Sequence, residues 1–186
     1  KVDEDGDETV IEIFVDDLKW AETNDAKVKE LIVRLHKEKF KITIDGEIKN
    51  YLGMQYPYDT STPGKFVLNV NQTAYIESMI TKFTLEDKVL HPTVDTPLPV
   101  FRNEDDLKSR MGKNIEKDQG LVDWAKTHTY PCIIGSLIHA MVHTRPDIAL
   151  AVSWLSRSMA CPQLYQYKAA RRTLIYLRDT KHLGIR

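Results

Sequence analysis

The sequence predicts an α+β fold in which two β-hairpins and a helix occupy residues 1–70, and helices occupy most of the remainder. Short apolar stretches bounded by turn-forming residues predict the hairpins. Apolar residues at three- and four-residue spacing predict the later helices. The composition, 42% hydrophobic and 28% charged over 186 residues, is typical of a globular chain, and no apolar run approaches the length of a membrane span.

The first predicted hairpin spans the stretch "VIEIFVDDLKW", residues 10–20. Strand-forming residues end at Phe14, and a second strand-like stretch begins at Leu18. Between them stand Asp16 and Asp17, two like charges whose repulsion opposes their proximity. Aspartate is also a common turn residue, so the residues leave two interpretations open: an exposed turn, or a site for a positive partner.

The rest of the first 70 residues alternates between helical and strand patterns. Residues 25–39 carry apolar side chains at helical spacing behind a cap at Asn24 and Asp25. Residues 40–44 alternate between apolar and polar side chains, which predicts a half-buried strand. The stretches "YLGMQYPY" and "KFVLNV", separated by the turn-rich "DTSTPG", predict the second hairpin.

From Asn71 onward the pattern is helical, and Asn71 is expected to cap a helix that runs to about Phe83. Residues 85–128 contain prolines and many charges with weak periodicity. We expect a long, irregular connection there, with room for one short helix, which argues against a single rigid core in this part. The stretches 130–143, 147–160 and 163–180 predict three helices separated by prolines.

Charge is unevenly distributed, although the formal net charge is only −1. Residues 1–24 hold nine acidic against two basic side chains, a balance of −7, and residues 145–186 hold eight basic against two acidic, a balance of +6. A partner that combines cations with phosphates would fit such a distribution, and solvated helix faces explain it equally well.

Cysteine and histidine do not form a recognisable metal motif. Cys132 and Cys161 lie far apart and make no CxxC pair, which predicts reduced thiols and a reducing compartment. His139 and His143 stand four residues apart on a predicted helix, but the sequence offers no third ligand. We therefore expect core or surface histidines.

Several motifs follow one another in a fixed order along the chain. They are "FVDD", "YLGM" about 35 residues further on, "GSL", "TRPDIA", "AVS", "LSR" and the closing "YLRDTKHLGI". In this order and spacing they resemble the reverse transcriptase of copia-type LTR retrotransposons. The resemblance covers nearly all of residues 8–186 and is weakest over 100–128.

The resemblance implies the C-terminal half of a right-hand polymerase palm at residues 1–70. A helical thumb at 71–160 would follow, with the irregular connection 85–128 inside it, and then a basic exit helix at 161–186. It also implies a longer polyprotein, in which the fingers and the first half of the palm precede this segment and an RNase H domain follows it.

The implied activity is metal-dependent nucleotidyl transfer by an RNA-directed DNA polymerase. Asp16 and Asp17 would be catalytic and would bind Mg²⁺, two ions in the complete site, with Mn²⁺ as the alternative. Phe14 stands where the family usually has tyrosine and would pack near the primer terminus. The family uses a further aspartate from a strand upstream of this hairpin, so we expect the isolated chain to be inactive.

Two further sets of residues would contact nucleic acid. Tyr51, Leu52, Gly53 and Met54 resemble the hairpin that grips the primer strand, although an ordinary hairpin with a glycine bulge explains these residues equally well. Three basic residues of the last helix would contact backbone phosphates of the duplex. They are Lys168, Arg171 and Arg178.

The partners implied are an RNA/DNA primer–template duplex, deoxynucleoside triphosphates and the remaining domains of the polyprotein, with no membrane. The implied location is the virus-like particle of such an element in the cytoplasm, with the nucleus as the alternative. The rival interpretation is a non-catalytic relic, or a co-opted module that binds nucleic acid or protein.

Overall fold

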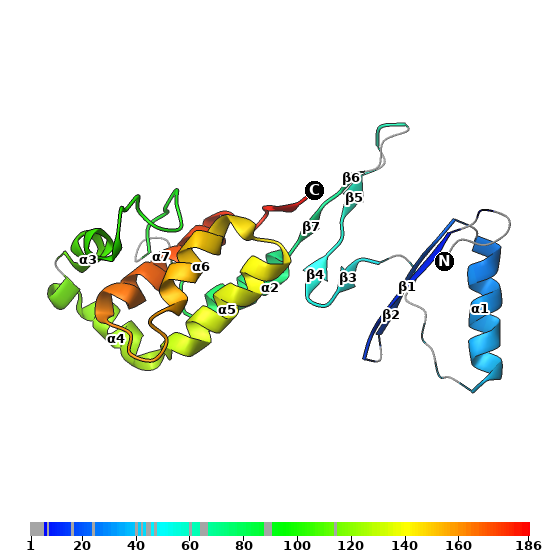
Figure 1. Ribbon diagram of the computed structural model, residues 1–186, viewed down its shortest axis with the longest axis horizontal. Coiled ribbons are helices and arrows are strands. Elements are labelled where there is room, and N and C mark those ends of the chain that lie inside the picture. The colour runs from blue at the N-terminus through cyan, green and yellow to red at the C-terminus, as the bar shows by residue number, and fades with distance from the viewer. Residues whose placement is uncertain are drawn as a thin grey trace. The chain divides into compact units, whose positions relative to one another are not determined.

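The structure is a computed structural model and describes most of the chain. The described residues are 6, 8–15, 17–23, 25–39, 41, 43, 46, 48–59, 61–63, 67–87, 91–113 and 115–186. The chain divides into two compact units, Lys1–Ile48 and Lys49–Arg186, whose elements are labelled in Figure 1. We call them the N-terminal and the C-terminal unit and describe each by itself.

The N-terminal unit contains the predicted first hairpin and helix. β1 (Thr9–Phe14) and β2 (Asp17–Glu22) pair antiparallel, and α1 (Asp25–Lys37) follows and contacts β2. Both elements confirm the pattern-based assignment. The strand expected over 40–44 stays a prediction, because residues 40, 42 and 44 lie outside the described part of the chain.

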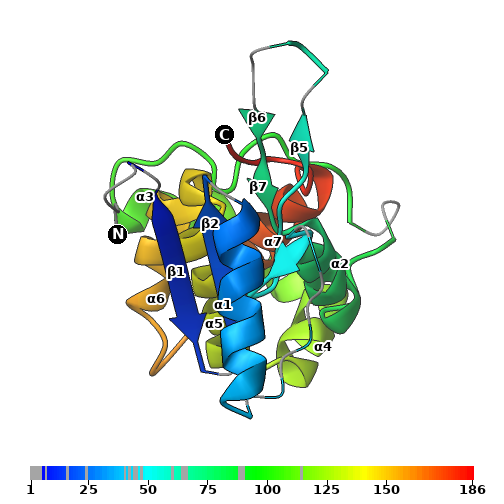
Figure 2. The same ribbon diagram turned by 90° about the vertical axis from the view of Figure 1, so that its right-hand side faces the viewer.

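The β-structure of the C-terminal unit is a small antiparallel sheet with the order β3-β4-β7-β8. Its strands are β3 (Asn50–Tyr51), β4 (Met54–Gln55), β7 (Val70–Asn71) and β8 (Gly184–Ile185). A separate ladder joins β5 (Tyr58–Asp59) to β6 (Val67–Leu68) and projects away from the helices of this unit (Figure 1, Figure 2). The sequence predicted one continuous strand over 51–58, but a tight turn after Tyr51 breaks it into β3 and β4.

The helices of the C-terminal unit pack around one apolar core. They are α2 (Thr73–Lys82), α3 (Glu104–Gly112), η1 (Ile115–Lys117), α4 (Gln119–Thr127), α5 (Tyr130–His143), η2 (Pro146–Ile148), α6 (Ala149–Ser156) and α7 (Leu164–Asp179). The positions of α2, α5, α6 and α7 confirm the periodicity of the sequence. Fully buried apolar side chains include Ile76, Leu121, Tyr130, Leu137, Leu155 and Leu174. Among the helices that the structure describes, none has the length and apolar character needed to cross a membrane.

The region 85–128 is more ordered than its sequence predicts. It contains α3 and α4, which contribute Leu107, Met111, Leu121 and Trp124 to the core. Each helix is short and has few apolar residues, so its periodicity is weak. Their starts are nevertheless capped in the ordinary way, because Asn103 and Asp118 each accept a backbone N–H three residues further on. The prediction of an irregular connection with room for one short helix is therefore corrected, because this region contains two α-helices that belong to the core.

α7 is the central helix of its unit rather than an exit from it. It contacts α2, α3, α4, α5 and α6, and Ala169 and Ala170 are fully buried. The two units also divide at residues 48 and 49, whereas the sequence suggested boundaries near 70 and 160. In the sequence, the alanines and arginines of α7 suggest a helix with one apolar face and one solvated face. In the structure, both the alanines and the arginines contact neighbouring elements, as described below.

Candidate functional site

The aspartate pair lies at the turn of the β1–β2 hairpin. Phe14 and Asp17 are opposite each other in the ladder, so their side chains project from the same face. Val15 begins the turn with a φ of 55°, and Phe14, Val15 and Asp17 are all exposed. Asp16 lies outside the described residues, so its place in the site stays a prediction.

A metal site at this turn stays a prediction as well. Within the described residues, no group of three or more histidine, cysteine, aspartate or glutamate side chains is placed to hold a metal ion. The described part of the turn nevertheless fits a hard divalent cation chemically, because it offers the exposed Asp17 carboxylate at a tight hairpin end.

The second candidate element is the β3–β4 hairpin. Tyr51 pairs with Met54, and both turn residues have positive φ, 50° at Leu52 and 75° at Gly53. This combination is typical of a two-residue type I′ turn, so the element is an ordinary hairpin without a bulge, and its role in gripping a primer stays a prediction. A side chain at Gly53 would meet no atom within 4 Å, which leaves its backbone open to an approaching ligand.

The β3–β4 hairpin is joined to α2 through its second strand. The Gln55 Oε1 accepts a hydrogen bond of 3.2 Å from the backbone N–H of Ala74, in the first turn of α2. At the base of the hairpin, the N–H of Tyr56 donates to the carbonyl of Lys49 over 2.9 Å. These bonds fix where the Leu52–Gly53 turn stands relative to the helices of the same unit.

The basic residues predicted on α7 do not form an exposed stripe. Arg178 is 8% exposed, and its guanidinium binds the Asp179 carboxylate with two bonds, of 2.9 and 3.1 Å, and the Leu85 carbonyl with one of 3.0 Å. Its donors are thereby satisfied inside the protein, as the planar guanidinium allows. The prediction that Arg178 contacts phosphates is therefore corrected to a structural role.

Arg171 and Lys168 differ from Arg178 in exposure. The Arg171 side chain is 15% exposed and pairs with Asp118 at 3.3 Å, the residue that caps α4. The Lys168 Nζ donates to the backbone carbonyl of Lys113 over 3.3 Å at an exposed position. Of the three predicted phosphate contacts, Lys168 is the one whose ammonium group lies in an exposed setting.

The structure reveals a buried charge network centred on Arg145, which is 1% exposed. Its guanidinium donates to both carboxylate oxygens of Asp147, at 2.9 and 2.7 Å, and to the carbonyl and hydroxyl of Thr180, at 3.0 and 2.7 Å. The Tyr176 hydroxyl also donates to Asp147, over 2.9 Å. Burial of Asp147 opposes its ionisation, but the charge and hydrogen bonds of Arg145 outweigh that effect and lower the pKa of the carboxyl. The sequence carried no signal for the link to Thr180, because that link joins residues 35 positions apart.

The histidines at the α2–α5 contact are structural, as the sequence predicted. The Gln72 amide, fully buried, lies between the His139 Nδ1 at 3.2 Å and the Thr144 hydroxyl, which donates to its Oε1 over 2.9 Å. The Nδ1 of His143 lies 2.8 Å from the carbonyl of His139. Burial and the neighbouring His143 lower the pKa of His139, which favours the neutral ring in this contact.

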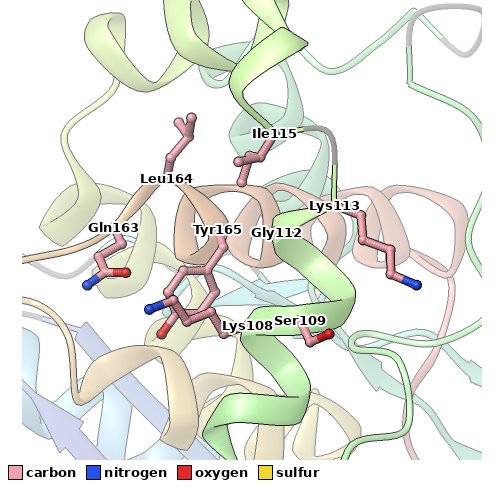
Figure 3. Close-up of a pocket in the computed structure, with 8 residues that line it drawn as sticks. All are labelled: Lys108, Ser109, Gly112, Lys113, Ile115, Gln163, Leu164 and Tyr165. Atoms are coloured by element: carbon pink, nitrogen blue, oxygen red, sulfur yellow. The ribbon is translucent and has the colours of Figure 1, made fainter.

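A hollow of about 480 Å³ lies between α3 and the start of α7 (Figure 3). Lys108, Ser109 and Lys113 line one side, and Gln163 and Tyr165 line the other. The Tyr165 hydroxyl donates to Glu104 of α3 at 3.2 Å, which links α7 to α3 beside the hollow. No pattern in the sequence indicated this hollow, because α3 was not predicted within the expected irregular connection.

Comparison with known proteins connects the chain to transposon polyproteins. The chain is 30% identical over 174 residues, 92% of its length, to the retrovirus-related Pol polyprotein from transposon TNT 1-94 of Nicotiana tabacum, and spans 12% of that polyprotein. A stretch of 60 residues, 32% of the chain, is 37% identical to the secreted RxLR effector protein 161 of Plasmopara viticola, of which it covers 42%. No protein-family model and no solved structure matches the chain. The chain is thus similar to a segment of a retrovirus-related Pol polyprotein from a transposon.

Proposed function

We propose that the chain is part of an RNA-directed DNA polymerase, which transfers nucleotides to a primer within a retrotransposon polyprotein. The observation that carries this proposal is the similarity to a Pol polyprotein along 92% of the chain. The proposal is supported by the position of Phe14 and Asp17, which are opposite each other at the end of the β1–β2 hairpin. Asp16 directly precedes Asp17 in the sequence.

In this proposal Asp16 and Asp17 would hold Mg²⁺ together with a carboxylate from another part of the polyprotein. Bound divalent cations supply activation of the primer hydroxyl and neutralisation of the triphosphate. Asp17 contributes a carboxylate on the same face of the hairpin as Phe14. The exposed Phe14 ring offers an apolar surface against which the terminal nucleotide of the primer can pack.

The β3–β4 hairpin would contact the primer strand. Its turn exposes the backbone of Gly53 without a side chain, which allows a sugar–phosphate backbone to approach closely. Contact through backbone groups is independent of base sequence, as a polymerase requires. The hairpin's link to α2 through Gln55 would hold this contact at a fixed place on the C-terminal unit.

The test is primer extension by a longer segment of the polyprotein that includes the sequence upstream of Lys1. Asp16→Asn keeps the side-chain shape but removes a charged metal ligand, so we expect nearly complete loss of extension with unchanged folding. Asp123→Asn, at an exposed position of α4, is the matched control and should retain full activity. A rate for Asp16→Asn above about a tenth of the parent's would contradict the metal role, since a lost ligand costs well over one factor of ten.

A second candidate function is a co-opted, non-catalytic binding module. The specific observation in its favour is the similarity of a 60-residue stretch to a protein named as a secreted effector. The C-terminal unit also has a core of its own, which lets it serve without the aspartate hairpin. If the longer segment with both aspartates intact extends no primer, while the chain binds a duplex or a protein, this candidate replaces the polymerase.

A further inference from the structure

The segment that follows α7, residues 180–185, contacts three other parts of its unit: Arg145, α2 and β7. We call this segment the C-terminal strap. Its first residue, Thr180, accepts two hydrogen bonds from the buried Arg145. The Thr73 hydroxyl has two acceptors within reach, the carbonyl of Lys181 at 3.0 Å and the Asn71 Oδ1 at 2.8 Å, and its single proton is shared between them. The ammonium of Lys181 pairs with Glu77. Thr73 and Glu77 belong to α2, so the strap is tied to both η2 and α2.

The strap then continues as β8, the strand next to β7. Gly184 is opposite Asn71 and Ile185 is opposite Val70. A Cβ atom at Gly184 would overlap the carbonyl oxygen of Val70 and lie 2.9 Å from the Cβ of Asn71. Glycine is therefore required at this position by the close approach of two backbones, not by its conformational freedom.

β7 links the strap to the candidate primer-binding hairpin. It pairs on its other side with β4 through Gln55 and Asn71, and β4 pairs in turn with β3. Each of these strands has two residues, so every ladder contributes few hydrogen bonds. Two-stranded pairings of this size are marginal alone, and a neighbouring strand contributes a large share of their order.

We propose that the C-terminal strap positions the β3–β4 hairpin, and that Gly184 and Thr73 are positioning residues for primer binding. The primer-binding part rests on the function proposed above. The strap joins the hairpin's sheet to the Arg145 network and to α2, and so fixes the Leu52–Gly53 turn against the helical core. Loss of the strap's contacts would loosen the hairpin, which the Gln55–Ala74 bond still ties to α2, while the core of the unit stays folded.

Hydrogen exchange of the 186-residue chain tests the strap itself. Gly184→Ala adds the Cβ that has no room, and Gly135→Ala, where a Cβ meets nothing within 4 Å, is the matched control. We expect the amide of Tyr56 to exchange at least about tenfold faster in Gly184→Ala only, with the amides of α5 unchanged. Equal exchange in the two variants would overturn the proposal.

Steady-state kinetics of the longer, active polyprotein segment test the consequence for the primer. Thr73→Val removes the hydroxyl that contacts Lys181 in the strap and Asn71 in β7, and Thr73→Ser keeps it. We expect Thr73→Val to raise KM for the primer–template by about fivefold or more at unchanged KM for the nucleotide, and Thr73→Ser to restore it. An unchanged KM for primer–template in Thr73→Val would overturn the positioning role. If the unmodified segment extends no primer, the polymerase proposal fails, and the exchange experiment still decides the strap.

Discussion

Replacing Arg145 with methionine removes the guanidinium that joins η2 to the end of α7. Arg145 is 1% exposed and makes four hydrogen bonds, two to Asp147 and two to Thr180. Methionine fills part of the volume but leaves the Asp147 carboxylate and the Thr180 carbonyl without this partner. Removing one member of a buried ion pair typically costs about 3–5 kcal/mol. The Asp147 side chain is 36% exposed, so water compensates in part, and we expect the lower end of that range.

Urea unfolding followed by tryptophan fluorescence measures this loss. In a Trp20→Phe background the signal comes from Trp124 and Trp154, both in the C-terminal unit. With a slope of about 2 kcal/mol per molar of urea, a loss of about 3 kcal/mol lowers the midpoint by about 1.5 M. Arg110→Met, an exposed partner of Asp106, is the control and should change stability by less than about 0.5 kcal/mol.

Two further variants separate the charge from the geometry of the network. Arg145→Lys keeps the charge but loses the planar guanidinium with its paired donors. Its loss of unfolding free energy should therefore fall between those of Arg110→Met and Arg145→Met. Adding Asp147→Asn to Arg145→Met should recover part of the stability, because the uncompensated carboxylate is then gone. If Arg145→Met unfolds at the same urea concentration as Arg110→Met, the network does not stabilise the fold and this reasoning is refuted.

Three other predictions follow from burial and charge. Burial lowers the pKa of His139, so the unfolded chain binds a proton more readily than the folded chain. The free energy of unfolding should therefore reach its full value above about pH 6.5 and fall as the pH drops below it. His139→Gln should make the melting temperature less dependent on pH around and below about pH 6.5. Leu137→Ala, fully buried, should lower the free energy of unfolding by about 2–5 kcal/mol in urea titrations, whereas Leu150→Ala, 67% exposed, should change it little. Arg178→Ala should destabilise the C-terminal unit in the same titrations, because it removes the buried guanidinium that binds the Asp179 carboxylate and the Leu85 carbonyl. Lys168→Ala should leave stability unchanged and, if α7 faces a duplex, should reduce the slope of the logarithm of the binding constant against the logarithm of the salt concentration by about one unit.

Elements with a strong local signal could be predicted from the sequence. The run of strand-forming residues that ends at Phe14 predicted the β1–β2 hairpin, and the apolar spacing after Tyr130 predicted α5, α6 and α7. α3 and α4 were missed because Leu107, Met111, Leu121 and Trp124 are too few to form a clear period. Their caps, Asn103 and Asp118, were the local signal that could have found them.

The environment of α7 could not be predicted from its own sequence. Lys168, Arg171 and Arg178 look alike as cations at helical spacing, but their partners come from Lys113, Asp118 and Leu85, far away in the chain. The Leu52–Gly53 turn was hidden in a similar way, because leucine rarely adopts positive φ and its neighbours suggested a continuous strand. Long-range contacts decided the environment of α7, whereas the Leu52–Gly53 turn is a local backbone feature that its residue types do not signal.

The central place of α7 has a consequence for synthesis of the protein on the ribosome. α2 to α6 leave the ribosome first, but the helix that contacts all five helices begins only at Leu164, and β8 follows at Gly184. Until then the nascent chain exposes the apolar faces that α7 will cover. Folding of the C-terminal unit is therefore delayed until almost all of this segment has been translated, and nascent chains stopped before Leu164 should depend on chaperones to avoid aggregation.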